Sequence, residues 1–161
     1  MLSPETERAG MILFLDWQRE ALIRKVDGLT QEQACATPTV SALSLLGIIR
    51  HSAFWERRWF QVIVAGRTFP GEWPESGNAG DDDTFRLEAT DTIESVVADY
   101  RSQIDASNQI LSTVDLDAPC AVAPLSNRNV RWVAMHLIEE TARHAGHADI
   151  IRETIDGVTG R

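Results

Sequence analysis

Apolar residues recur every three or four positions along four long stretches of the chain. This spacing places them on one face of an α-helix, so the pattern predicts four long helices. The helices are expected over about residues 3–27, 41–64, 92–114 and 130–156. Ser3, which precedes a proline, favours the first start, and Gly28, Gly66 and Gly157 are stop signals.

Shorter signals complete the predicted order of elements. Thr30–Gln33 reads as a capping box for a short helix that Pro38 ends, and Asp91 with Glu94 caps the third long helix. The links over residues 67–90 and 115–129 are long and show no clear strand alternation, although residues 84–87 could pair locally. The first link suits a mobile cover, part of a pocket rim or a solvated loop. We therefore predict one all-α domain over residues 1–161, a four-helix bundle with a long crossover connection.

Composition and charge narrow the partners of this domain. The chain has 161 residues, 43% of them hydrophobic, with 15 Lys and Arg against 24 Asp and Glu, so its net charge is −9. An acidic surface repels phosphate backbones and anionic lipid, which argues against nucleic-acid and membrane partners. The two cysteines form no CxxC pattern, and no targeting segment or membrane-spanning run is evident. A cytoplasmic protein is expected.

The last helical stretch carries an unusual pair of residues. Glu140 and His144 lie one turn apart within its apolar stripe, whereas Glu139 points to the opposite, polar side. A carboxylate among apolar residues is costly unless it is paired or binds a cation. The pair could be a buried ion pair of the helix or two ligands of one metal ion.

The second helical stretch supplies a third residue of this kind. His51 lies at the edge of the stripe formed by Ile48, Trp55 and Val62, and alone it could be a hydrogen-bonded core histidine. Together, His51, Glu140 and His144 would form a set of two histidines and one carboxylate. Three protein ligands leave a coordination position open, as catalytic zinc sites do.

Two segments resemble motifs of a known superfamily. His51 with the Phe54-Trp55-Glu56 that follows it, and the run from Glu139 to Asp149, resemble the second- and fourth-helix motifs of the DinB-like metal-binding four-helix bundles. The chain is most similar to a mainly actinobacterial branch of that superfamily. Its ligand set is similar to that of the N-terminal domain of mycothiol-dependent maleylpyruvate isomerase, a zinc enzyme that carries a further C-terminal domain.

The resemblance implies an up-down-down-up bundle, a homodimer and a divalent metal at His51, Glu140 and His144, with Zn²⁺ favoured over Ni²⁺ or Fe²⁺. It implies a metal-dependent enzyme acting on small molecules, a transferase or isomerase that uses a low-molecular-weight thiol such as mycothiol. Two alternatives stay open, a hydrolase that uses metal-bound water and a non-catalytic stress-response or ligand-binding protein. His147 is a candidate proton shuttle and Arg58 a candidate contact for an anionic substrate, whereas His136 is assigned a structural role.

Overall fold

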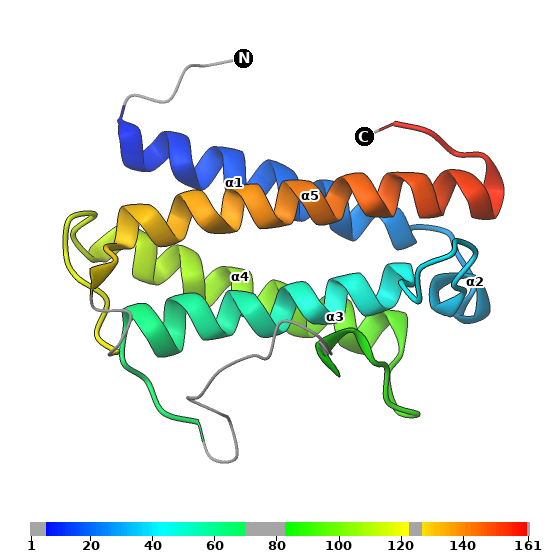
Figure 1. The fold of residues 1–161 in the computed structure, drawn as a ribbon, viewed down its shortest axis with the longest axis horizontal. Coiled ribbons are helices and arrows are strands. Elements are labelled where there is room, and N and C mark those ends of the chain that lie inside the picture. Colours follow the sequence, from blue (N-terminus) through cyan, green and yellow to red (C-terminus); the bar gives the residue numbers. More distant parts are fainter. Residues whose placement is uncertain (1–5, 70–82, 123–126, 161) are drawn as a thin grey trace.

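The computed structural model describes residues 6–69, 83–122 and 127–160, and these form an all-helical fold (Figure 1). The long helices are α1 (Glu7–Ile23), α3 (Leu45–Glu56), α4 (Ile93–Thr113) and α5 (Val130–Asp156). The short elements are α2 (Gln31–Cys35), the 3₁₀ turns η1 (Arg24–Val26) and η3 (Asp83–Phe85), and the π-helical segment η2 (Arg57–Val64). Within the described ranges there is no strand, only one isolated antiparallel bridge between Pro119 and Asn129. The all-α prediction is confirmed.

The four long helices lie side by side in two pairs. Helix α1 packs mainly on α5, and α3 packs mainly on α4, while α1–α4 and α3–α5 contacts join the pairs. The sequence colours of Figure 1 show α1 and α5 running in one direction and α3 and α4 in the other. None of the described helices has both the length and the apolar character needed to cross a bilayer.

The helix starts differ from several that the sequence predicts. Ser3 lies outside the described residues, and Thr6 caps α1 by accepting a hydrogen bond from the backbone N–H of Ala9. Ser44 caps α3, so this helix begins about one turn later than predicted. Thr92 and Ser95 form the capping box of α4, in place of Asp91 and Glu94. Hydroxyl and carboxylate caps contribute similar stabilities of about 1 kcal/mol, so the sequence alone does not decide between neighbouring cap residues.

Other boundary signals are confirmed. Thr30 and Gln33 form the predicted capping box of α2, although this helix ends at Cys35, before Pro38. Gly66 and Gly157 follow η2 and α5 with left-handed φ angles of 68° and 76°. Such angles are strained for residues with a Cβ atom, which explains why glycine marks these ends.

The second predicted helix changes geometry in the middle. After Glu56 the α-helix continues as the π-helical η2, whose i→i+5 hydrogen bonds place more residues in each turn. In an α-helix, a step of four residues rotates slightly more than one full turn around the axis. In the wider π-helix the same step rotates slightly less, so the two deviations offset each other. Trp59 therefore stays on the same side as His51 and Trp55, and the three side chains line one cavity.

The interior has three levels along the bundle. One apolar cluster contains Leu22, Ala53, Tyr100 and Ala148, and the other contains Leu15, Phe60, Ile110 and Leu137. On each long helix, one or two buried polar residues fall between the members of the two clusters. This polar layer comprises Arg19, Glu56, Gln103, Ser107, Thr141 and His144.

Candidate functional site

A cavity of about 290 Å³ opens between α3 with η2 on one side and α5 on the other. It includes all three residues that the sequence predicts as metal ligands. The lining residues are His51, Ser52, Trp55, Glu56, Trp59, His136, Leu137, Glu140, Thr141 and His144. The cavity therefore reaches the polar layer through Glu56, Thr141 and His144, and indole rings form much of its apolar wall.

The two predicted histidine ligands lie next to each other. The imidazole rings of His51 and His144 are 4.7 Å apart between centroids and steeply inclined, at 71°. Both residues are buried, and the Nε2 atom of His144 lies 3.9 Å from Oε2 of Glu140. Helix periodicity explains the second contact, because residues four apart project from the same side of α5.

Glu140 is more exposed than its place in the apolar stripe suggests. Its side chain is 31% exposed, and its Oε1 atom accepts a hydrogen bond from Arg143 at 3.0 Å. The two carboxylate oxygens thus have different neighbours, since Oε1 meets Arg143 and Oε2 faces His144. The carboxylate is paired at the surface of the cavity, while Glu139 is exposed, as predicted.

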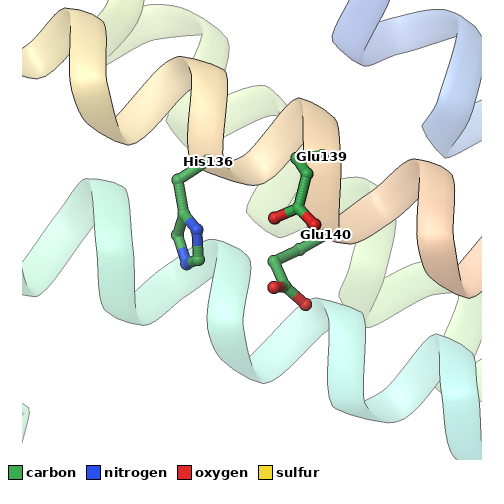
Figure 2. Close-up of side chains that lie close together, drawn as sticks. All are labelled: His136, Glu139 and Glu140. Carbon is green, nitrogen blue, oxygen red and sulfur yellow. The ribbon is translucent and has the colours of Figure 1, made fainter.

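A second group of ligand-type atoms shares Glu140. The side chains of His136, Glu139 and Glu140 bring one nitrogen and two oxygens within 4.8 Å of one another. Figure 2 shows them projecting from one stretch of α5, with His136 and Glu140 pointing the same way. Arg143 forms ion pairs with both carboxylates, so a cation at this group would compete with a guanidinium.

His136, to which the sequence assigns a structural role, is one of the residues that line the cavity. Its ring stacks on Trp132 at 4.9 Å and meets Trp59 edge-on at the same distance. Burial lowers the pKa of His136, against the opposing effect of Glu140 and Glu139. The available sequence signal was its position one turn before Glu140, on the side of the helix that carries the ligands.

The donor set suits a divalent cation. Imidazole nitrogens and a carboxylate oxygen are the usual zinc ligands, and in a tetrahedral site such atoms lie about 3.4 Å apart. The 3.9 Å between Nε2 of His144 and Oε2 of Glu140 is close to this spacing, and the His51 ring lies beside that of His144. The same donors also suit other first-row metals, so they do not identify the ion.

The polar side of the cavity contains residues that sequence analysis did not identify. Glu56 is fully buried and forms an ion pair with the equally buried Arg19 of α1. Ser52 and Thr141 place hydroxyl groups beside the fully buried Tyr100, whose pKa is raised mainly by burial and by Glu56. No spacing rule within one helix reveals these contacts, because each joins residues of different helices.

The two predicted catalytic residues lie beside the cavity and are not among the residues that line it. His147 is exposed, with its ring 5.9 Å from that of His144. The guanidinium of Arg58 lies 4.8 Å from the centre of the Trp55 ring, and burial lowers the pKa of Arg58 to about 10. Catalytic roles for both residues stay predictions.

Comparison with known proteins assigns the chain to a family. Curated proteins show no significant match to it. The family model described as mycothiol-S-transferase matches residues 11–157, which include every helix from α2 to α5 and most of α1. This family is part of the DinB-like superfamily. The chain therefore belongs to the mycothiol S-transferase family.

Proposed function

We propose that the protein is a metal-dependent enzyme that transfers mycothiol, or a similar small thiol, to an electrophilic small molecule. The main support is the placement of His51, Glu140 and His144 around one cavity in a member of the mycothiol S-transferase family. We propose Zn²⁺ at these residues, with Ni²⁺ and Fe²⁺ as alternatives, since all three accept nitrogen and oxygen ligands.

A divalent cation held by His51, Glu140 and His144 would lower the pKa of a bound thiol, so that the thiol loses its proton to solvent and is present as a thiolate at neutral pH. A carbon–sulfur bond to the substrate would then form as the bond from that carbon to its leaving group breaks, and the leaving group would take the bonding electrons. The chain contributes the surroundings of this step. Leu137, Trp55 and Trp59 shield the reacting groups from water, which strengthens electrostatic attraction within the cavity.

The family match supports thiol transfer over the two alternatives. A hydrolase would use the same ligands with bound water, and a binding protein would need no open coordination position. The match over residues 11–157 is to a family named for thiol transfer and favours neither alternative. The free thiols of Cys35 and Cys120 support the proposal of a cytoplasmic location, where cysteines stay reduced.

A cobalt titration tests the thiol mechanism. Protein loaded with Co²⁺ is expected to develop a near-ultraviolet sulfur-to-metal charge-transfer band when mycothiol or a simpler thiol is added. The titration should use a variant with Cys35→Ser and Cys120→Ser, because the protein's own thiols could otherwise produce the band. If the cation is bound with a freely exchanging water ligand and no band develops, the thiol mechanism is wrong and hydrolysis takes its place.

We also propose that the long helices form the up-down-down-up bundle of the superfamily, which the directions of the helices in Figure 1 support. A homodimer is proposed through α1 and α5, where a groove of about 610 Å³ runs along the outer side of the pair. Phe14 and Trp17 line it and expose 51% and 38% of their surfaces. Aromatic residues that remain exposed beside a groove are typical of protein interfaces.

The dimer proposal predicts that Phe14→Glu yields a monomer, because it would replace an exposed aromatic ring of each protomer with a carboxylate that must be desolvated at the interface. Light scattering across a range of concentrations measures the change. Met135→Glu is the matched control, since Met135 is also an exposed apolar residue but is not among those lining the groove. A wild-type protein that is monomeric at high concentration, or a dimer that survives Phe14→Glu, would contradict the proposal.

A further inference from the structure

The turn η3 packs against α3 around the predicted ligand His51. Thr84 places its hydroxyl oxygen 2.6 Å from Nδ1 of His51. Phe85 stacks its ring on the His51 imidazole, with centroids 3.8 Å apart and planes inclined by only 5°. The backbone carbonyl of Thr84 accepts a hydrogen bond from Arg50 at 3.1 Å. Two successive residues of η3 thus contact both the edge and the face of one imidazole.

The backbone of α3 is shaped for this close approach. A Cβ atom added to Gly47 would lie only 2.6 Å from the carbonyl oxygen of Phe85. Such a contact is too short for any side chain, and backbone on both sides leaves little room for adjustment. Gly47 therefore allows η3 to lie directly on α3, one turn before His51.

Contacts with α5, with the residues before α4 and with the apolar interior also hold η3 in place. Arg50 forms an ion pair with Asp91, 3.2 Å away, just before α4 begins. The rings of Phe85 and His144 also meet, at 5.7 Å and nearly edge to face. Phe85 packs against the apolar cluster that contains Leu22 and Tyr100. The turn is thereby tied to α3, α4 and α5 at once.

Either His51 or Thr84 can be the donor of the hydrogen bond between them. If Nδ1–H donates to the Thr84 oxygen, Nε2 has a lone pair and can bind a cation. If the Thr84 hydroxyl donates to Nδ1, a neutral imidazole carries its proton on Nε2, which blocks metal binding there. Metal-ligating histidines usually donate their other N–H to an oxygen acceptor, which fixes the tautomer and the ring orientation.

We infer that Thr84 is a positioning residue for the metal, one that accepts Nδ1–H of His51 and so keeps Nε2 unprotonated. This inference rests on the proposed function, because it takes His51 as a ligand. Threonine suits the role, since its hydroxyl accepts a hydrogen bond and its β-branched side chain has few rotamers. Phe85 complements Thr84, because its stacked ring restricts rotation of the His51 imidazole.

The test compares two substitutions that separate hydrogen bonding from packing. Thr84→Val keeps the branched shape but removes the acceptor, and it is expected to weaken Zn²⁺ or Co²⁺ affinity by about 10- to 100-fold. Thr84→Ser keeps the acceptor and should bind the cation within a few-fold of wild type. Thr154→Val serves as control, because Thr154 is an exposed threonine near the far end of α5. Competition with a chromogenic chelator measures all affinities.

A second measurement needs no metal. Long-range ¹H–¹⁵N spectra of the metal-free protein report which ring nitrogen of each histidine is protonated. Wild type and Thr84→Ser are expected to show His51 protonated on Nδ1, and Thr84→Val should shift the ring toward the Nε2–H form. A His51 ring that is protonated mainly on Nε2 in wild type would overturn the inference.

The outcomes distinguish this inference from the proposed function. If His51→Ala abolishes metal binding but Thr84→Val binds as wild type does, the role of Thr84 is wrong and the metal site stands. If Thr84→Val and Thr84→Ser weaken binding equally, the turn acts through packing alone, which also refutes the inference. If wild type binds no cation, or His51→Ala binds it unchanged, the proposed function itself fails.

Discussion

Replacing His144 with alanine is expected to reduce the metal content of the purified protein from about one divalent cation per chain to nearly none. The substitution removes a nitrogen donor that faces both the His51 ring and Oε2 of Glu140. A carboxylate and one imidazole bind a cation far more weakly than three donors do, because each ligand adds to the binding free energy. Elemental analysis after dialysis measures the loss.

His136→Ala is the matched control for this prediction. His136 lies on the same helix and lines the same cavity, but it belongs to the group with Glu139 and Glu140. Its variant should keep most of the cation, because His51, Glu140 and His144 all remain. If His136→Ala and Glu139→Gln lose the metal while His144→Ala retains it, the cation binds at that second group and the predicted ligand set is wrong.

Replacing Arg19 with alanine is expected to lower the free energy of unfolding by about 3–5 kcal/mol. Arg19 is fully buried and donates to both carboxylate oxygens of Glu56, which is also buried. It also donates to Asp16 at 2.7 Å and Asn108 at 2.8 Å. Without the guanidinium, the Glu56 carboxylate is left in the interior without its ion-pair partner, and that desolvated charge dominates the cost.

Urea denaturation followed by circular dichroism measures this loss of stability. Arg101→Ala is the control, since Arg101 pairs with Glu20 at 2.8 Å on the exposed surface, and it should cost less than about 1 kcal/mol. A double variant with Arg19→Met and Glu56→Leu should recover much of the lost stability, because it removes both buried charges together. A loss for Arg19→Ala no larger than for Arg101→Ala would contradict the interpretation.

Local sequence signals predicted the helices well because local interactions determine them. The fourth long helix was predicted over residues 130–156, and α5 has these bounds, since Asn129 caps its start and Gly157 ends it in a left-handed conformation. The sequence signals do not single out Asn129 as the cap. Spacing along α5 also brought Glu140 and His144 together, a contact that depends only on helical periodicity.

Local sequence signals did not predict the π-helical hydrogen bonding or the contacts between residues of different elements. Nothing in the spacing of residues 57–64 separates a π-helix from an α-helix, because the difference lies in which backbone carbonyl each N–H selects. The contact of Thr84 with His51 joins residues 33 positions apart through a link whose course the sequence does not fix. Glu56 belongs to the motif that follows His51, but its ion-pair partner Arg19 lies on another helix.

The polar layer also determines how the helices align along their length. Leu, Ile and Val surfaces fit together in more than one way, so two apolar clusters alone would tolerate a helix shifted by one turn, about 5.4 Å. Such a shift would carry Arg19 away from Glu56 and leave two buried charges facing hydrocarbon, at a cost of several kcal/mol. The ion pair thus excludes shifted registers of α1 against α3. Glu56 also lines the cavity. The ion pair that selects the register of α1 against α3 therefore also determines where along the bundle axis the cavity forms.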